Sequence, residues 1–527
     1  MARSNSSKQD ERAGHGSAIR VCFLAGLICL ASLVSAPARL VQVTILHTTD
    51  LHGHLLPTTD YDGNTGVGGF LQCAGRIAAW KAKRPHALLI DCGDLFQGSP
   101  ESFRARGRVM MEALSHFSYD AWVLGNHDFD WGLDLLADLV RTVPTPVLAA
   151  NMYTLPGHPN PLASVKPYVM LSVEGVNVAV IGLITPGIPR WSRPELIQSM
   201  LFKPSVEAMR EILPRVRAEG ADIVIVAAHQ GYREFGDDHA NELNAVARAF
   251  PEIDAIIGGH THRPIEQASI NGVLYTQAGY HGIWLGILEL TFDTVSRKVV
   301  HRSAKLERVG PGDPWHPPLA EAWEGLITST QAELDRPLTR SSDVFTPHPS
   351  RIGISPVQRL ISRAIADASK ADFVLHGALS SAILPEGPIA VRHVWDIVPY
   401  ENTIGIAHLN VSEIKEILEE SLALRATPFM LGPLGFHYRI ETHDGVRRAV
   451  ELRDEKGRPL HSRRRYKVAF NSYTLASGGN RFPRLREIVD QPSSRLTMLE
   501  IDTRTAVQRY LRSKRVLSLE KIMEGAP

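Results

Sequence analysis

The feature that most constrains this chain is a pattern that recurs between Val41 and about Leu306: an apolar run, a polar turn and a helix-like stretch. The apolar runs are rich in β-branched and aliphatic residues, and most end in Gly, Asp, Asn or His. Strands that alternate with helices indicate an α/β layered domain, in which ligands bind just beyond the carboxyl ends of the strands. The runs are VQVTILHTTD, ALLIDCGD, AWVLGNHD, VNVAVIGLITP, DIVIVAAHQG and IDAIIGGHTH, with helix-like stretches such as GGFLQCAGRIAAWKAK and LDLLADLVRTV between them.

Side chains that bind metals or move protons gather at the ends of these runs. Each lies where a predicted strand gives way to a loop, so one edge of one sheet could bring them together. Taken singly, most of these motifs are ordinary turns, and only their shared context gives them weight. The candidates are Asp50, His52, Asp94, Asn126, His127, His229, His260 and His262.

These residue types form a coherent set of metal ligands. Oxygen and imidazole donors suit Mn, Zn, Fe, Co or Ni, and they do not select one of these ions. The set is larger than a single four-coordinate metal needs, whereas two metals that share one carboxylate would use it. Metal pairs about 3.5–4 Å apart recur in phosphoryl hydrolysis. The sequence therefore predicts two divalent metal ions.

The length of 527 residues predicts two domains, because one hydrophobic core rarely serves so long a chain. Residues 39–308 contain the alternating pattern. A Gly- and Pro-rich break, VGPGDPWHPP, and a predicted connecting helix, LAEAWEGLITSTQAELDRP, place a linker at residues 309–341. Residues 342–520 mix helical patterns (SPVQRLISRAIADAS, VSEIKEILEESLAL) with strand-like ones (NTIGIAHL, FHYRIET, YKVAFNSY), which indicates an α+β domain.

Residues 1–38 have the pattern of a secretory signal peptide. A polar, Arg-containing start precedes the apolar run VCFLAGLICLASLV and the small-residue segment SAPAR. The run is shorter than the roughly 20 residues that span a membrane. We expect cleavage after Ala38 and a periplasmic or secreted protein, with an uncleaved anchor as the alternative.

Charge and cysteine content narrow the class of partner. The 57 basic and 56 acidic residues leave a net charge of +1, so no overall field attracts nucleic acid or an anionic membrane. We expect a monomer with a small-molecule phosphoester substrate, no nucleic-acid partner and no stable membrane association after cleavage. Outside the signal only Cys73 and Cys92 remain, and the sequence leaves open whether they pair or stay as buried thiols.

The motifs D-x-H, G-D, G-N-H-(D/E)-x-D, H and G-H-x-H resemble those of the calcineurin-like metallophosphoesterases. The segments HTTDLHGHLLP, GDLFQGSP, GNHDFDWG and GGHTH are similar to the bacterial periplasmic 5′-nucleotidase family. VRHVWDIVPYENT and NSYTLASGGNRFP extend the resemblance to that family's C-terminal nucleotidase domain. The resemblance implies a four-layer α/β/β/α sandwich followed by an α+β substrate-binding domain.

The resemblance also assigns roles within the candidate site. It makes His127 a residue that faces the transferred phosphoryl group rather than a ligand, and Asp130 the residue that orients it. Asp128 is then structural. Asn126 faces the substrate as well as a metal. By this resemblance one metal takes Asp50, His52, Asp94 and His262, and the other takes Asp94, Asn126, His229 and His260.

The second domain departs from the family pattern where the substrate is held. At the family's Asn-Gly-Gly segment and following Arg, this chain has LHGALSSAIL, with His376 in place of the Asn and no Arg after it. Arg481 could contact a phosphate in place of that Arg. The family's two stacking aromatic rings predict Tyr473 or Phe482 on one side of a base and Phe436 or a neighbour on the other. The Gly-Gly-Asp-Gly-aromatic motif reads Gly478, Gly479, Asn480, Arg481 and Phe482.

The favoured function is hydrolysis of nucleoside 5′-monophosphates by direct attack of a metal-bound water, with 2′,3′-cyclic nucleotides or nucleotide sugars as further substrates. One alternative is a thiosulfohydrolase of bacterial sulfur oxidation, a family relative that uses the same metals on another bond. Another is a secreted binding protein that has lost the activity of an ancestral enzyme, although such a protein should also have lost some of the metal ligands.

Overall fold

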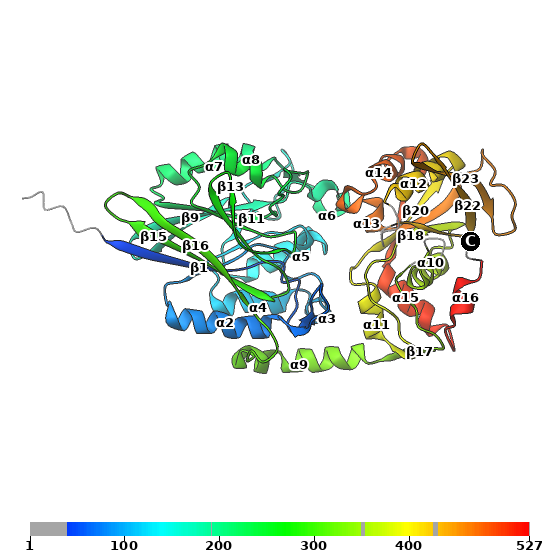
Figure 1. Ribbon diagram of the computed structural model, residues 1–527, viewed down its shortest axis with the longest axis horizontal. Coiled ribbons are helices and arrows are strands. Elements are labelled where there is room, and N and C mark those ends of the chain that lie inside the picture. Colours follow the sequence, from blue (N-terminus) through cyan, green and yellow to red (C-terminus); the bar gives the residue numbers. More distant parts are fainter. Residues whose placement is uncertain (1–38, 191, 349–353, 425–429, 526–527) are drawn as a thin grey trace, which may run out of the picture.

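The computed structural model describes residues 39–190, 192–348, 354–424 and 430–525, and these form two domains linked by helix α9 (Pro317–Leu334). Helix α9 runs along one side of the molecule from the N-terminal domain to the C-terminal domain (Figure 1). The predicted signal peptide lies outside the described residues. No helix within the described ranges is long and apolar enough to cross a bilayer.

Two β-sheets build the N-terminal domain. The first has the strand order β16-β15-β1-β4-β5-β6, and the second has the order β13-β14-β12-β11-β9-β8. The six predicted apolar runs form β1, β4, β5, β9, β11 and β12, so all six strand predictions are confirmed. The bounds are β1 Leu40–Thr48, β4 Leu88–Asp91, β5 Ala121–Val123, β6 Val147–Leu148, β8 Tyr168–Val173, β9 Val176–Ile184, β11 Ile223–His229, β12 Ala255–Gly258, β13 Pro264–Ile270, β14 Val273–Ala278, β15 Trp284–Asp293 and β16 Lys298–Arg308.

The two sheets pack face to face and helices cover their outer faces (Figure 1). Buried side chains such as Ile45 and Ile90 from the first sheet meet Ile225 and Ile257 from the second. This arrangement is the predicted α/β/β/α sandwich, and the helix predictions for α2 and α5 are also confirmed. The bounds of the covering helices are α2 Phe70–Lys83, α3 Pro100–Ala105, α4 Arg108–Phe117, α5 Leu133–Thr142, α7 Ser205–Ala218 and α8 Leu243–Ala249.

The strand ends that carry the candidate ligands belong to both sheets, so the expectation of a single sheet edge is wrong. β1, β4 and β5 of the first sheet precede Asp50, Asp94 and Asn126, whereas β11 and β12 of the second sheet precede or carry His229 and His260. Parallel neighbours such as β1 and β4, or β11 and β12, point the same way within each sheet. The carboxyl ends of both sheets meet at one end of the sandwich, where Nε2 of His229 lies 3.1 Å from Oδ2 of Asp94. Cys73 and Cys92 are buried and free, so they are two separate thiols.

The C-terminal domain is built on one sheet with the strand order β21-β18-β24-β20-β25. Apolar side chains of α10, α11, α15 and α16 cover one face, and those of α12 and α14 cover the other. Capping boxes at Ser355 and Asn410 start α10 and α12 at the places that the sequence predicts. The bounds are β17 Pro337–Ser341, α10 Pro356–Ser369, β18 Phe373–His376, β19 Gly387–Ala390, α11 Val391–Ile397, β20 Thr403–Leu409, α12 Val411–Ala423, β21 Gly432–Leu434, β22 Phe436–His443, β23 Val446–Asp454, β24 Tyr466–Asn471, α13 Ser472–Leu475, α14 Pro483–Val489, β25 Thr497–Asp502, α15 Thr503–Arg512 and α16 Leu519–Met523.

Candidate metal centre and substrate cavity

Most of the predicted ligands have backbones in the left-handed region, which L side chains rarely adopt. Each residue in this conformation costs on the order of 1 kcal/mol of conformational free energy, so the conformation is stable only where the surrounding structure holds it. Strain of this kind clusters at functional sites, and here it falls on one residue set that follows the ends of three strands, β1, β4 and β12. The residues are Asp50 (φ 50°), His52 (φ 48°), Asp94 (φ 53°), His260 (φ 69°) and His262 (φ 54°).

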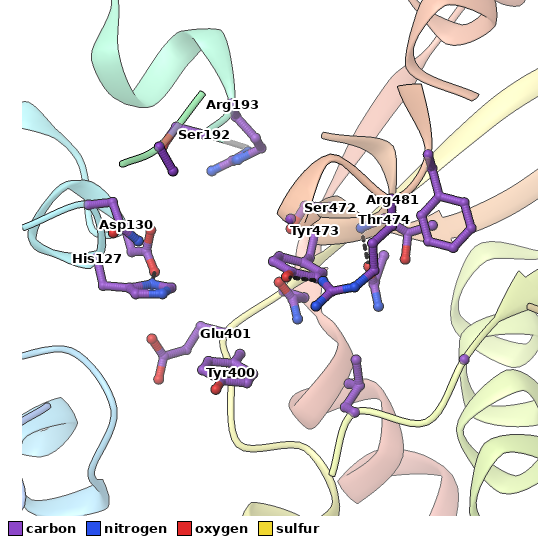
Figure 2. Close-up of a pocket in the computed structure, with 18 of the residues that line it drawn as sticks. His127, Asp130, Ser192, Arg193, Tyr400, Glu401, Ser472, Tyr473, Thr474 and Arg481 are labelled. Carbon is purple, nitrogen blue, oxygen red and sulfur yellow. Dashed lines mark hydrogen bonds and ion pairs between the residues drawn. The ribbon is translucent and has the colours of Figure 1, made fainter. Parts of the chain in front are cut away.

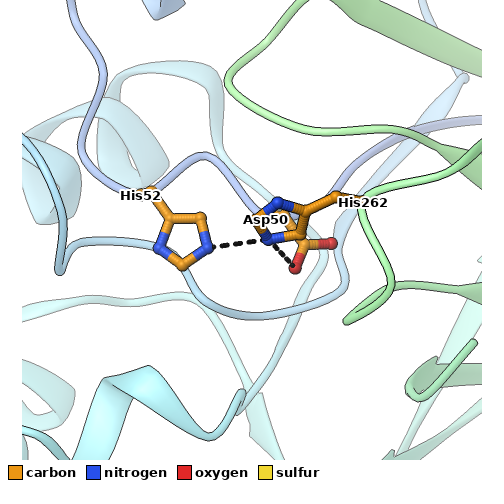
Figure 3. Close-up of side chains that lie close together, drawn as sticks. All are labelled: Asp50, His52 and His262. Carbon is orange, nitrogen blue, oxygen red and sulfur yellow. Dashed lines mark hydrogen bonds and ion pairs between the residues drawn. The ribbon is translucent and has the colours of Figure 1, made fainter. Parts of the chain in front are cut away.

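The first candidate metal group consists of Asp50, His52 and His262 (Figure 3). Nε2 of His52 is 3.1 Å from Nε2 of His262, which is 3.3 Å from Oδ1 of Asp50. His52 donates from Nδ1 to the carbonyl oxygen of Gln97 at 2.7 Å, so its Nε2 lone pair faces the group. Burial lowers the pKa of His52 to about 3, which keeps the imidazole neutral, as metal ligation requires.

The second candidate group consists of Asp94, His229 and His260. Nε2 of His229 lies 3.1 Å from Oδ2 of Asp94 and 3.1 Å from Oδ1 of Asn126, which adds the amide to this group. Oδ2 of Asp94 is also 3.7 Å from Nε2 of His52. The Asp94 carboxylate therefore lies between the two groups, in the position of a ligand that would bridge two bound metal ions.

The orientation of the imidazoles shows that both groups suit a cation. Nδ1 of His229 donates to the carbonyl oxygen of Cys92 at 2.7 Å, as Nδ1 of His52 does to Gln97. A carbonyl oxygen can only accept, so the Nε2 lone pairs face other acceptors. Facing acceptors repel one another unless a cation lies between them. At His229 a proton competes with a cation for the position between these acceptors. Burial lowers the pKa of His229, but the Asp94 carboxylate raises it more, and the net result is a rise to about 9.

His127 lies beside these groups and belongs to neither. It begins the short helix η1 (His127–Phe129), and its Nδ1 is 2.7 Å from Oδ2 of Asp130. Its backbone N–H donates to Oδ1 of Asp94 at 2.7 Å. Burial lowers the pKa of His127, but the carboxylates of Asp130 and Asp94 outweigh burial and raise that pKa to about 10. The arrangement favours an imidazolium next to the metal groups.

Asp128 ties together the two loops that carry Asp94 and Asn126. Its carboxylate accepts hydrogen bonds from the backbone N–H groups of Leu95 at 3.0 Å and Gly125 at 2.8 Å. Gly125 has to be glycine, because a β-carbon there would lie 2.2 Å from Oδ1 of Asp94. The structural role expected for Asp128 agrees with these contacts.

Tyr61 is a contact that the sequence did not predict, because DYDGN has only the composition of a turn. Its hydroxyl oxygen is 2.6 Å from Nδ1 of His262, and its ring stacks on Tyr280 at 4.2 Å.

We expect Tyr61→Phe to weaken metal binding at the first group by about 10-fold, because the hydrogen bond that orients His262 is lost while the stack remains. Titration of the metal-free protein with Mn²⁺ measures this. Tyr153→Phe, which removes an exposed hydroxyl bonded to Glu211, is the control; equal affinity in both variants would contradict the role.

A cavity of about 490 Å³ opens from the metal centre into the second domain. Asn126, His127 and Asp130 line its N-terminal wall, and Tyr473 and Arg481 face them from the C-terminal domain (Figure 2). Arg193, Arg233 and Asp238 also line the first wall. Cavities of 300–1,000 Å³ between domains commonly bind small molecules.

The structure brings some of the predicted substrate residues to this cavity and not others. Tyr473, Gly479 and Phe482 line it. Gly478 leaves room for the Tyr473 ring, since a β-carbon there would lie 2.2 Å from it, whereas the exposed Asn480 is not among the lining residues. Phe436 is 1% exposed and packs in the core against Phe373 at 4.8 Å, so its prediction as a stacking ring is wrong.

The departures from the family pattern fall in different places. His376 is fully buried behind the cavity wall, where its Nε2 lies 3.0 Å from Nδ2 of the lining residue Asn471. Arg481 lines the cavity, and its guanidinium donates to the Tyr473 hydroxyl at 2.7 Å and to the Gly478 carbonyl at 3.0 Å. Tyr400 and Glu401 also line the cavity, and the sequence does not predict them, although the PYENT segment contains them.

Comparison with known proteins covers both domains. Residues 43–264 match the family described as calcineurin-like phosphoesterase, and residues 331–487 match the 5′-nucleotidase C-terminal domain. The chain is 25% identical to the 5′-nucleotidase of Vibrio parahaemolyticus over 87% of this chain and 89% of that protein. It is also 25% identical, over 84% of its length, to the trifunctional nucleotide phosphoesterase YfkN of Bacillus subtilis, of which it spans only 36%. It spans a similar share, 38%, of a second relative from that organism.

Among solved structures, a putative 5′-nucleotidase from Staphylococcus aureus shares the fold. The alignment has a TM-score of 0.78 at 22% identity and covers 90% of this chain and 97% of the other. The predicted two-domain architecture and the predicted family resemblance are therefore confirmed. The chain belongs to the calcineurin-like phosphoesterases that carry a 5′-nucleotidase C-terminal domain.

Proposed function

We propose that this protein hydrolyses nucleoside 5′-monophosphates with the help of two divalent metal ions. The observation that carries the proposal is one cavity with two chemically different walls. His127, together with Asn126 and His260 of the second metal group, lines one wall, and the aromatic ring of Tyr473 stands at the other. Figure 2 shows His127 and Tyr473 on these opposite walls. When the phosphate of a nucleotide binds at the first wall, its nucleoside points toward the second wall. All seven predicted ligands lie in the two groups or next to them, which argues against a relic binding protein.

The residues of this chain bind and orient the phosphate for attack by water. Bound at the two groups, divalent cations supply positive charge that polarises the phosphoryl oxygens and lowers the pKa of the attacking water. Asp50, His52 and His262 would hold one cation, Asp94 would be shared, and the remaining ligands would hold the other. The His127 imidazolium, oriented by Asp130, stabilises negative charge or gives its proton to the leaving oxygen. No covalent intermediate on the protein is needed.

The C-terminal wall supports a nucleoside as the leaving group. Tyr473 offers an aromatic face that stacks on any base, since every base has a π-face. Asn402, Asn471 and Arg481 add polar groups that can bond the sugar or base edge. Cyclic nucleotides and nucleotide sugars present the same parts and are further candidate substrates.

The proposal includes export to the periplasm or the medium. Its support is the sequence of residues 1–38, with the apolar run Val21–Val34 followed by small residues. Fractionation of cells that express the full chain, followed by N-terminal sequencing of the mature protein, tests it. A mature protein that begins near Arg39 is expected; full-length protein in the cytoplasm would contradict export.

A substrate panel with metal removal tests the enzymatic proposal. We expect Mn²⁺-dependent phosphate release from nucleoside monophosphates, and a loss of at least about 100-fold after chelation, because bound cations lower the activation barrier by several kcal/mol. The panel contains nucleoside monophosphates, cyclic nucleotides, sugar phosphates, bis(p-nitrophenyl) phosphate and a thiosulfonate. Phosphate from the monoesters, nucleoside monophosphate from the cyclic nucleotides, p-nitrophenol from the diester and sulfate from the thiosulfonate are measured before chelation, after chelation and after Mn²⁺ is restored.

Three other results of this panel would each contradict a part of the proposal. Hydrolysis of bis(p-nitrophenyl) phosphate alone would overturn the nucleotide substrate and keep the phosphoesterase. Sulfate release from the thiosulfonate without phosphate release would support the sulfur chemistry instead. Full activity after exhaustive chelation would contradict the proposal that divalent cations take part in the reaction.

A further inference from the structure

We infer that Glu401 is a positioning residue that fixes the C-terminal wall of the cavity against the metal-bearing wall. Its carboxylate oxygen Oε2 accepts hydrogen bonds from Nε2 of Gln97 at 3.1 Å and from Nε1 of Trp131 at 2.9 Å. Both donors belong to the N-terminal domain. Two hydrogen bonds between the domains therefore end on one atom, at the edge of the cavity. We call the cluster formed by Glu401, Gln97, Trp131 and Arg504 the Glu401 contact.

The C-terminal side of the Glu401 contact is rigid. Arg504 at the start of α15 donates to Oε1 of Glu401 at 3.1 Å and to the carbonyl oxygens of Val398 and Pro399 at 3.0 and 2.7 Å. Its guanidinium lies 3.3 Å from the centroid of the Trp395 ring. The side chains of Arg504 and Glu401 are only 4% and 14% exposed, so water weakens their ion pair little. Glu401 thus presents a fixed acceptor to the other domain.

On the N-terminal side, both donors are part of the candidate site. The backbone carbonyl of Gln97 accepts the Nδ1 hydrogen bond of the ligand His52 at 2.7 Å. Trp131 directly follows Asp130, which orients His127. Glu401 therefore touches one residue that holds a metal ligand and one that adjoins the His127 pair.

The same loop places an aromatic ring over the site. Tyr400 precedes Glu401, and its ring is nearly parallel to that of His127, at 15° with centroids 6.0 Å apart (Figure 2). If the contact breaks, Tyr400 and the wall that carries Tyr473 are free to shift relative to the metal groups. A substrate that must touch both walls then binds only to the fraction of molecules in which they are aligned, which raises its apparent dissociation constant.

The test weakens the contact from the N-terminal side by removing one of its two interdomain hydrogen bonds, so that Arg504 stays paired with Glu401. Trp131→Phe deletes the indole N–H and keeps an aromatic ring. Trp80→Phe is the matched control, because Nε1 of Trp80 also donates to a glutamate, Glu307, at 2.9 Å, within one domain. Glu401→Gln is the second variant. Spin labels on Cys residues introduced at the exposed positions Lys298 and Thr442 report the distance between the domains.

We expect Trp131→Phe to broaden the distribution of label distances and to raise KM for a nucleoside monophosphate by about 10-fold, with kcat within about twofold of wild type. Trp80→Phe should change neither. A distribution as narrow in Trp131→Phe as in Trp80→Phe would overturn the inference, and so would a broad distribution with unchanged KM. The KM readout rests on the proposed function, but the distance readout does not. Broadening in a protein that hydrolyses no nucleotide would therefore keep the domain contact and reject only the function.

Discussion

Replacing Asp94 by Asn is expected to lower kcat for phosphate release by roughly 1000-fold without unfolding the protein, a loss of about 4 kcal/mol in transition-state stabilisation. Asp94 is the carboxylate that lies between the two metal groups, 3.1 Å from Nε2 of His229 and 3.7 Å from Nε2 of His52. Burial alone would raise the pKa of Asp94, but the imidazoles of His229 and His127 hold it well below its usual range. Asparagine keeps the shape of the side chain and loses the negative charge that two bound cations would share.

Metal content and activity should fall together in this variant. Metal analysis of the purified protein should show fewer ions per chain than in the wild type, and kcat should stay low at saturating Mn²⁺. Asp91→Asn is the matched control, because Asp91 is also fully buried at the end of β4 but bonds only to Thr48 and to the backbone N–H of Gly93 in the contacts described. Equal losses in both variants would assign the effect to the loss of a buried carboxyl group instead of metal bridging.

The sequence allowed the ligand positions to be predicted because they depend on local pattern. An apolar run followed by Asp, Asn or His marks the carboxyl end of a strand, and this pattern predicts Asp50, Asp94 and His229 as ligands. Which sheet a strand joins depends on partners far away in the chain. β1 pairs with β15 on one side and β4 on the other, and both neighbours are as apolar as the strands of the second sheet. The sequence could not separate the two sheets for that reason.

The substrate wall was harder to predict because aromatic residues serve both cores and ligands. Phe436 begins a strand and turns into the core, whereas Tyr400 lies in a loop and reaches His127. The contact between Trp131 and Glu401 joins residues 270 positions apart, so no local pattern reveals it. Loop residues at the boundary between domains can be assigned only when both domains are in place.

Replacing His127 by Gln is expected to lower kcat for nucleoside monophosphates by about 100- to 1000-fold and to leave metal content unchanged. His127 belongs to neither metal group, and its Nδ1 is held 2.7 Å from Oδ2 of Asp130. In the proposed mechanism the imidazolium lies next to the phosphoryl group and therefore acts on charge that develops during the reaction. Asp130→Asn should cost less, because the imidazole remains and only its orientation and charge are weakened. A loss of bound metal in His127→Gln would show that this residue is a ligand instead.

The leaving group decides which of two actions His127 performs. If the imidazolium protonates the leaving oxygen, the loss in His127→Gln should be large for a nucleoside alkoxide and small for p-nitrophenolate, which leaves without a proton. If it stabilises charge on the phosphoryl oxygens, the loss should be similar for both, because that charge develops whatever group departs. Comparing kcat for a nucleoside monophosphate and p-nitrophenyl phosphate in wild type and variant separates the two. The contact of the His127 backbone N–H with Asp94 keeps the residue at the phosphoryl end of the cavity, so we expect similar losses.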